Sequence, residues 1–592
     1  ESPSAPVVGV LRTRGRFLVG EPLFDQGRRV TVDRAGDAQV GQLVLMTPSR
    51  QGRRARGHRV ARVLGSPDVA RDVLEALLLD RGLPRRVARM VGVEAEGVAA
   101  GPYGEDEIVR EDLRELPTFT IDPVTAKDFD DAISAEQPDP NRPERITIWV
   151  HIADVAAYVR PGGAIDGDAR WRGTSVYVPG TVEPMLPPTL SNDACSLVPN
   201  VDRLAVTVRM ELDGSEIVKT SVTRSVIRSD VRLDYDQVDR IFAGQERAED
   251  PWATPLTVAR RAALARQERR EDSTSALELN TGEPQFRFDD AGHVDGIVIE
   301  RQTEAHRLIE HLMVAANEQV AKLLDEHSVP TLHRVHGLPT PTSARRLAEQ
   351  LASVGVPTTD VLAGLGEHAT AEDAGAAIAA LSRAVDAHVR KTGHGRAGLS
   401  YLVLRALQQA RYEPRSLGHA GLGLTHYCHF TSPIRRYPDL IAHRAVLSLV
   451  GAGEQAPAGS SSRLEELGVW CSATEREAMG IERTADQIAR AFLLHRTLFE
   501  HGWDQRFEGE ISGLSHGGAF VRFGGGTLDD EAFEGMLPAR LMSSDWWELD
   551  ERGTILAGTK TGKSLKIGDP VSVHVDRVEP ERGRVTLIPA PR

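Results

Sequence analysis

The sequence predicts a multidomain protein in which a mixed α+β body lies between two small β-barrels of the OB-fold type. Three observations lead to this class. The chain has 592 residues, too many for a single hydrophobic core. Both ends show short apolar strands separated by Gly-rich and polar turns, which is the pattern of small barrels. The long segment between them mixes strand patterns with the apolar periodicity of helices.

Composition narrows the class of protein. A hydrophobic content of 41% and a charged content of 26% are ordinary for a globular chain. No apolar run reaches the roughly 18 residues of a membrane helix, and no signal-peptide core opens the chain. The cysteines Cys195, Cys428 and Cys471 form no C-x-x-C pair, which argues against a disulfide framework or a zinc site. We therefore expect a cytoplasmic protein without a membrane partner.

The first barrel is expected over residues 1–66. The net charge of the chain is −14, yet residues 1–65 contain twelve Arg, no Lys and five acids. A basic module on an acidic body favours a surface that follows phosphates, with a solvated arginine-rich face as the alternative. Phe17 and Phe24 are candidates to stack on bases, although we expect at least one of them in the core. The strand patterns fall at 7–11, 16–19, 29–32, 42–45 and 58–63.

Helical periodicity over 69–78 predicts a helical connector at residues 67–118. Within the body, residues 119–502, it predicts an amphipathic helix over 305–324, a helical region over 343–388 and a long helix over about 463–501. The Gly, Ala and Ser of 451–461 predict a flexible insertion. Residues 503–592 return to barrel patterning, with strands around Gly-rich turns.

The stretch Thr120–Ile133 places four carboxylates, Asp122, Asp128, Asp130 and Asp131, within ten residues between two strand patterns. Four like charges on a short loop repel one another unless a cation lies among them, and Mg²⁺ prefers carboxylates, waters and substrate phosphates as ligands. A solvated acidic loop is the alternative. The stretch lacks the sixth-position Gly and the closing Glu of an EF-hand.

A second stretch carries Arg435 and Arg436 between Pro433 and Pro438, which stiffen the backbone. Hydrolysis of a phosphodiester builds negative charge on phosphoryl oxygens, and a fixed guanidinium stabilises that charge opposite metal ions. An arginine pair that bridges structural aspartates is the alternative. Together, the carboxylates and the arginine pair indicate two-metal phosphoryl transfer more strongly than either does alone.

Three segments resemble one known family, the RNase II/RNase R exoribonucleases. They are T-I-D-P-V-T-A-K-D-F-D-D-A at 120–132, M-L-P-P-x-L-S-N-D-x-C-S-L at 185–197 and H-F-T-S-P-I-R-R-Y-P-D-L at 429–440, in family order. The resemblance covers about 119–500 and continues through the last barrel. It implies an RNB-type catalytic domain over 119–502, with a cold-shock-like barrel before it and an S-one-type RNA-binding barrel after it.

The resemblance implies processive hydrolysis of single-stranded RNA from the 3′ end to nucleoside 5′-monophosphates. It implies two Mg²⁺ ions, for which Mn²⁺ is expected to substitute. Asp122 and Asp131 match the positions most directly tied to metal. Asp128 and Asp130 match the other two acidic positions, with Asp130 on the metals or the terminal ribose. Arg435 matches the catalytic arginine.

The same resemblance implies an RNA-binding set. Tyr177, in T-S-V-Y-V-P-G, matches an aromatic that stacks on a terminal base, whereas the residues alone favour a core aromatic. Glu310 matches an acidic residue near the 3′ end of the substrate. Glu482 falls near a further acidic position of the family, but without a fixed register it is not counted as a site residue. We also expect RNA contacts from Arg436, Phe17 and Phe520.

Two departures from the family leave the digestion of structured RNA open. Leu279 stands where a second clamping aromatic is expected, so the clamp is one-sided or uses Phe286. One cold-shock-like barrel is evident where two are common, because the chain was trimmed or because this branch lost one. The chain also lacks a Lys-rich tail. Two rival functions are a non-catalytic RNA-binding relative and a two-metal enzyme acting on DNA or a small phosphoester. We expect a monomer.

Overall fold

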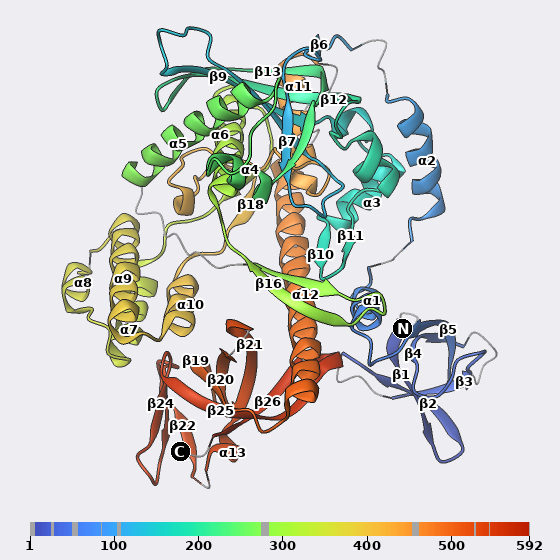
Figure 1. Cartoon of the computed structure of the whole chain (residues 1–592), viewed down its shortest axis with the longest axis vertical. Helices are drawn as coiled ribbons and strands as arrows, with labels where there is room; N and C mark the ends of the chain where they lie inside the picture. Colours follow the sequence, from blue (N-terminus) through green and yellow to red (C-terminus); the bar gives the residue numbers. More distant parts are fainter. Residues whose placement is uncertain are drawn as a thin grey trace.

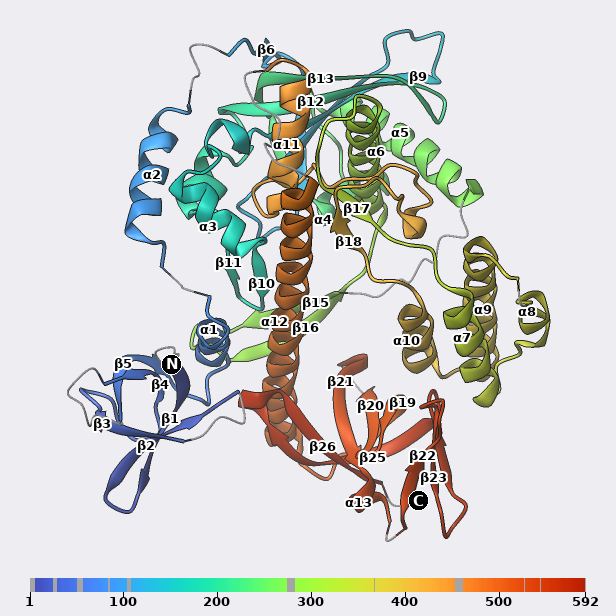
Figure 2. The same ribbon diagram turned by 180° about the vertical axis from the view of Figure 1, so that it is seen from behind.

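The computed structural model describes residues 6–24, 29–49, 57–83, 86–103, 108–273, 283–366, 368–452, 461–525, 528–543 and 545–590. Figure 1 shows an α+β body with one barrel near each terminus. The long helix α12 (Ser461–His501) runs from the body down to the barrels, as Figure 2 shows from behind. This helix matches the one predicted over 463–501.

The first barrel is closed in the order β1-β2-β3-β5-β4. Alternating apolar residues of β1 and β4 fill its interior, where Leu11, Val44 and Met46 are buried. The predicted five-stranded barrel is thus confirmed. Its strands are β1 (Val7–Arg14), β2 (Phe17–Pro22), β3 (Val30–Arg34), β4 (Leu43–Pro48) and β5 (His58–Gly65). Two helices, α1 (Ala70–Asp80) and α2 (Arg89–Ala100), follow it.

The body is built on a seven-stranded sheet in the order β14-β7-β8-β9-β12-β13-β6. Its central pairs are antiparallel, while the outer pairs β14·β7 and β13·β6 are parallel. Strand β9 is buried along almost its whole length, as expected for a central strand between helices. The strands are β6 (Glu111–Asp112), β7 (Phe119–Asp122), β8 (Asp131–Glu136), β9 (Arg145–Ala153), β12 (Asp202–Asp213), β13 (Glu216–Arg228) and β14 (Val231–Asp234).

Helices cover this sheet. The predicted helix over 305–324 is α6 (Glu304–Glu326), whose apolar side packs with α5 (Ala253–Ser273) against the central strands. Three other helices complete the body: α3 (Ala164–Arg172), α4 (Tyr235–Phe242) and α11 (Tyr437–Leu449). Three two-stranded antiparallel sheets pair β10 (Val176–Val178) with β11 (Thr181–Glu183), β15 (Glu283–Phe288) with β16 (Val294–Glu300), and β17 (His333–Val335) with β18 (Arg411–Glu413).

Between β17 and β18 the chain forms a helical insert with its own hydrophobic core. It contains α7 (Pro341–Ser353), α8 (Thr359–Gly364), α9 (Ala371–Thr392) and α10 (Arg396–Ala406), so the helical region predicted over 343–388 is present. The insert docks on the second barrel: Ile567 and Leu514 of the barrel pack on its core. The predicted insertion at 451–461 lies largely outside the described residues.

The second barrel is closed in the order β19-β20-β21-β26-β25, which confirms the second predicted barrel. Phe507, Phe523 and Phe533 fill its core. Its strands are β19 (Phe507–Ser515), β20 (Gly518–Gly525), β21 (Leu528–Pro538), β25 (Pro570–Glu579) and β26 (Arg584–Pro589). A short helix, α13 (Ala539–Met542), and a side sheet of β22 (Trp547–Leu549), β23 (Ile555–Gly558) and β24 (Ser564–Lys566) complete it. None of the helices in the described part of the chain could span a membrane.

Candidate active site

The acidic loop joins two neighbouring strands of the central sheet. Asp122 ends β7 and Asp131 begins β8. Ser196, from the second family-like motif, fixes the loop between them: its hydroxyl accepts from the backbone N–H of Phe129 (3.0 Å) and donates to the carbonyl of Lys127 (2.8 Å). A motif some seventy residues away therefore fixes the conformation of the carboxylate loop.

The arginine segment meets this loop at Asp130. The Asp130 side chain is buried; its Oδ1 accepts from the N–H of Ile434 at 2.8 Å, and its Oδ2 lies 3.7 Å from Nε of Arg435. The Arg435 side chain remains 42% exposed, and its Nη2 donates to Oγ of Ser432 at 3.1 Å. The carbonyl of Arg435 accepts from the N–H of Ser175, which links this segment to the strand that carries Tyr177.

Burial and mutual repulsion raise the pKa values of Asp122, Asp130 and Asp131. Burial raises the pKa of Asp130 well above its usual value, against the opposing charge of Arg435. The pKa of Asp122 is raised by burial and then by the charge of Asp131, and burial likewise raises the pKa of Asp131. Perturbed acids next to an exposed guanidinium are typical of functional sites. The charges of Arg435 and Arg436 on Asp131 and of Arg232 on Asp122 oppose this rise in pKa without cancelling it.

The residues fit a hard cation. Oδ2 of Asp122 is buried and makes no hydrogen bond of normal geometry, although the Thr120 hydroxyl is near enough to the carboxylate to lower its pKa. Among the described residues, no three His, Cys, Asp or Glu side chains already converge on one metal position. Mg²⁺ commonly binds through one or two carboxylates together with waters and substrate phosphates rather than in an all-protein cage. The donor set therefore suits Mg²⁺ bound jointly with substrate.

Tyr177 contacts the acidic loop from the surface and is not a core residue. It is 40% exposed, and its phenol donates to Oδ2 of Asp128 at 3.2 Å. Its backbone N–H donates to Oε1 of Glu482 at 2.9 Å, across 305 positions of sequence. Burial raises the pKa of Glu482, as does the charge of Asp486, against the opposing effect of the Tyr177 N–H. Glu482, which the sequence analysis left aside, thus belongs to the site.

Arg436 lies differently from Arg435. Its Nε and Nη2 donate to the two carboxylate oxygens of Asp439 at 2.9 and 2.8 Å, and the Asp439 side chain is fully buried. The same carboxylate accepts from the N–H of Ser432. Arg436 therefore has a structural role: it pairs with a buried aspartate, which was the alternative to a catalytic arginine pair. A contact from Arg436 to RNA stays a prediction.

Tyr235 is a further neighbour of the acidic loop. It begins α4 and stacks on His306, with ring centroids 3.8 Å apart. Burial raises the pKa of its phenol, and the charges of Asp131 and Asp122 raise it further. Its place follows from the pairing of β14 with β7, which sets Asp234 beside Asp122. No motif in the sequence signals this parallel pairing.

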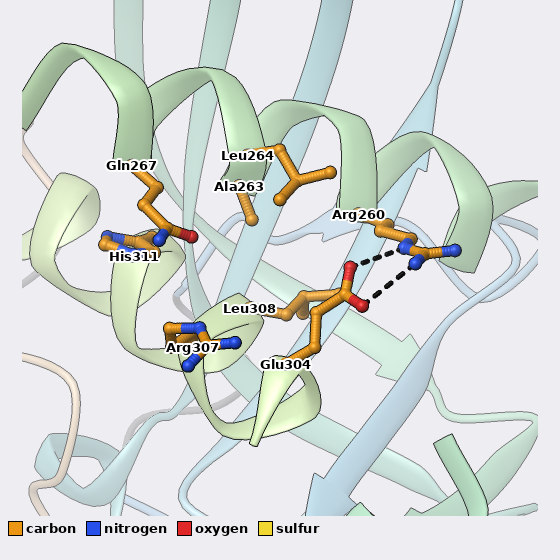
Figure 3. A pocket seen from close by; sticks show the side chains of 8 residues that line it. All are labelled: Arg260, Ala263, Leu264, Gln267, Glu304, Arg307, Leu308 and His311. Carbon is orange, nitrogen blue, oxygen red and sulfur yellow. Dashed lines mark hydrogen bonds and ion pairs between the residues drawn. The ribbon is translucent and has the colours of Figure 1, made fainter. Parts of the chain in front are cut away.

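Glu310 lies on α6, where Gln302 donates to its carboxylate at 2.6 Å and Arg270 lies 3.4 Å away. The nearby pocket between α5 and α6 is shown in Figure 3, with Arg260 holding Glu304 through two hydrogen bonds. Its volume of ≈ 10 Å³ has room for about one water at most. This pocket is therefore not a substrate site.

The other predicted aromatics lie in the barrels and the β15–β16 hairpin. Phe17 is exposed, with the guanidinium of Arg16 lying 5.1 Å from its ring centroid. Phe520 is exposed on β20, whereas Phe24 packs against the core that joins the first barrel to α12. Phe286 packs against the core of the second barrel. Leu279 lies outside the described residues.

Comparisons with known proteins agree with this geometry. The family model described as RNB domain matches residues 110–451, and the S1 RNA binding domain matches residues 500–588. Ribonuclease R of Escherichia coli is 32% identical over 575 residues, covering 93% of this chain and 66% of that protein. Ribonuclease R of Aquifex aeolicus is 33% identical over 538 residues, covering 90% of this chain and 72% of that protein.

The fold has a solved counterpart as well. Mycoplasma genitalium RNase R, solved in complex with ribose methylated single-stranded RNA, superposes with a TM-score of 0.82 at 24% identity, covering 99% of this chain and 90% of that chain. The chain spans about two thirds of the length of the Escherichia coli ribonuclease R. With the RNB domain covering more than half of its length, the chain belongs to the RNase II/RNase R family of 3′→5′ exoribonucleases.

Proposed function

We propose that this chain hydrolyses single-stranded RNA from its 3′ end, processively, and releases nucleoside 5′-monophosphates. The observation that carries the proposal is the approach of Arg435 to Asp130, 3.7 Å apart, on a loop where burial raises the pKa values of Asp122 and Asp131 and the charge of Asp131 raises that of Asp122 further. An acidic site with one exposed guanidinium suits a phosphate that binds together with cations. The relatives named ribonuclease R support the same reaction.

Asp122, Asp128, Asp130 and Asp131 would hold the metal, which we propose to be two Mg²⁺ ions with Mn²⁺ as a substitute. When bound, the ions lower the pKa of a water molecule and neutralise phosphoryl oxygens. The partly exposed guanidinium of Arg435 lies next to Asp130, where it would stabilise the negative charge that builds up on the phosphate. The Ile434 N–H and the buried position keep Asp130 fixed beside it.

Tyr177 would stack on the terminal base. Its phenol is tied to Asp128 and its backbone to Glu482, so the ring is held in place before RNA arrives. Stacking tolerates any base because every base has a π-face, which suits an enzyme that degrades any sequence. The two flanking barrels supply the type of fold that binds single strands. The described chain brings these groups together by itself, which supports a monomer, and its three buried, free cysteines favour the reducing cytoplasm.

The test is a time course on 5′-labelled poly(A) with Mg²⁺. We expect a ladder of shortened labelled RNA, nucleoside 5′-monophosphates as products, and no shortening in EDTA. Asp130→Asn should abolish the ladder while RNA binding in a gel shift persists, because it removes charge but little surface. RNA that stays full-length with the unaltered chain would favour a non-catalytic RNA-binding relative instead. Loss of both binding and cleavage in Asp130→Asn would make that residue structural.

A matched DNA oligonucleotide forms the second arm. Preference for RNA rests on contacts to the 2′-OH, so we expect the DNA to be shortened far more slowly than the RNA. Equal rates on both would overturn the RNA specificity and leave a general two-metal phosphodiesterase. Replacing Mg²⁺ by Mn²⁺ in the RNA arm should preserve cleavage. Sedimentation of the chain at working concentration tests the monomer.

A further inference from the structure

A group of aromatic rings gathers at the C-terminal end of α12, outside the candidate active site. His495, Phe499 and Trp503 follow one another at four-residue spacing. Their ring centroids lie 4.9 Å apart for His495–Phe499, 6.0 Å for His495–Trp503 and 6.3 Å for Phe499–Trp503, all edge to face. Phe499 is 70% exposed and Trp503 37% exposed. We refer to these three residues as the α12 aromatic cluster.

The fold does not need the cluster for its core. The side chains that anchor this end of α12 to the second barrel are Leu494 and Leu498, which are fully buried with the barrel core. None of the three aromatic residues belongs to any core cluster of the described residues. A phenyl ring that leaves most of its surface in water contributes little hydrophobic stabilisation. The rings are therefore available to a ligand.

The surroundings of the cluster favour bases over a protein surface. The exposed side chains next to it along the chain are polar or charged, namely Arg496, Glu500, His501 and Asp504. Between residues 490 and 510, the only large apolar side chains left exposed in the described chain are Phe499 and Trp503. A docking site for a protein usually presents a contiguous apolar patch. Isolated aromatic faces among polar groups are instead the feature on which unpaired bases stack.

The place of the cluster also fits RNA. The lower part of α12 packs on strands β21, β25 and β26 of the second barrel. The same helix shares a core with the first barrel, where Ile481 and Ile488 meet Val8 and Leu43. Figures 1 and 2 show this end of α12 between the two barrels from both sides. A single RNA strand that contacts both barrels would pass the C-terminal end of α12.

We propose that the α12 aromatic cluster is a base-stacking site for single-stranded RNA, separate from the catalytic site. Phe499 and Trp503 present the exposed faces, and His495 supports them edge-on. The identity of the ligand as RNA rests on the proposed function. The site holds unpaired bases without regard to sequence, since stacking uses the π-face that all bases share.

The test measures affinity in EDTA, where no hydrolysis occurs, by fluorescence anisotropy of labelled oligo(A). A length of about 20 nucleotides is long enough to reach both barrels, since an OB fold takes roughly 4–16 nucleotides. Phe499→Ala and Trp503→Ala should each raise Kd roughly 5- to 10-fold, the lower part of the range for losing one stacked base. The matched control is Val469→Ala, an equally exposed apolar residue (68%) near the other end of the same helix. Its Kd should stay within about twofold, because it offers no π-face.

Two conservative variants test whether stacking is the cause. Phe499→Tyr keeps the ring and should bind as the unaltered chain does, whereas Phe499→Leu keeps the apolar surface without a π-face and should bind as Phe499→Ala does. The proposal would be overturned if Phe499→Leu bound RNA as tightly as the unaltered chain, or if the Kd of Phe499→Ala stayed within about twofold of the unaltered value. Because binding is measured without turnover, the outcome is independent of catalysis. If RNA binding depends on Phe499 but the chain never shortens RNA, the proposed exoribonuclease function is wrong and the stacking site still stands.

Discussion

Two adjacent arginines of one loop have different environments, and the difference assigns their roles. Arg435 extends toward the acidic loop and keeps a large part of its surface exposed, so it can meet a phosphate. Arg436 is committed to the buried carboxylate of Asp439. A buried charge that loses its partner is strongly destabilising, whereas an exposed guanidinium can be removed at little cost to the fold. Catalytic and structural effects should therefore separate between neighbouring positions.

Replacing each arginine by alanine tests this assignment. Arg435→Ala should lower kcat by roughly 100- to 1000-fold, in line with the loss of one group that stabilises transition-state charge, and leave the melting temperature almost unchanged. Arg436→Ala should lower the free energy of unfolding by about 3–5 kcal/mol, because Asp439 stays buried without its partner. Kinetics and thermal melts on both variants give the answer. A stable but inactive Arg436→Ala beside a nearly normal Arg435→Ala would exchange the two roles.

Tyr177 combines an exposed ring with a phenol tied to Asp128. Tyr177→Ala removes a stacking contact of roughly 1–3 kcal/mol, so short RNA should dissociate earlier and the shortest end product should become longer. Tyr177→Phe is the matched control, since it keeps the ring and loses only the hydroxyl. Its end product should keep the original length. The measurement is the limit product of an exhaustive digest, and an unchanged product in Tyr177→Ala would contradict the stacking role.

At the level of elements, the sequence predicted what is local and missed what pairs at long range. The helices now seen as α6 and α12 were predictable because their apolar periodicity lies within each segment. Glu482 was not predictable as a site residue, because its contact with Tyr177 depends on how α12 crosses β10. Tyr235 was missed for the same reason, since only the pairing of β14 with β7 brings it to the acidic loop.

The central sheet carries a buried polar chain that no local pattern indicates. Hydroxyl and imidazole groups link Thr118, Ser134, His151, Thr207 and Ser225, with contacts of 2.7, 3.1, 2.8 and 2.6 Å in that order. Such a network is stable only when every member is satisfied. Burial lowers the pKa of His151 to about 3, so the ring stays neutral in the fold. The network therefore makes stability depend on pH.

Replacing His151 with Gln isolates that dependence. The unfolded chain binds a proton near the ordinary value of 6.5 and the folded chain does not, so the contribution of His151 is present above pH 6.5 and is lost on acidification. From about pH 7 to pH 5.5 the unaltered chain should lose about 1.3 kcal/mol relative to His151→Gln. Melting temperatures of both proteins across this range supply the measurement, and all other titrating groups cancel in the difference. A difference that does not change with pH would mean that His151 has the same pKa in the folded and the unfolded chain.

For the whole molecule, the question is what fixes the second barrel relative to the catalytic body. Glu510 of β19 is buried, and its carboxylate accepts from the N–H groups of Gly395, Ala397 and Gly398 at 2.7, 2.6 and 3.3 Å. A carboxylate suits the N-terminus of α10 because the free N–H groups and the helix dipole there favour negative charge. A Cβ on Gly398 would lie 2.6 Å from the carbonyl of Ile511, so only glycine allows this approach. The barrel and the helical insert are thereby joined as one unit.

Glu510→Ala tests whether this joint positions the barrel for RNA. It leaves three N–H groups without their acceptor, and the free energy of unfolding should fall by about 3 kcal/mol, the scale of hydrogen bonds to a charged group. Without the joint the barrel keeps its packing on α12 and on the core of the insert but loses its polar anchor, so KM for long RNA should rise several-fold while kcat on a tetranucleotide stays unchanged. The matched control is Glu508→Ala, an exposed residue on the same strand whose side chain pairs with Arg506 and Ser572, and it should change neither quantity. If Glu510→Ala lowers kcat/KM equally on long and short RNA, the joint supports the fold without guiding the substrate.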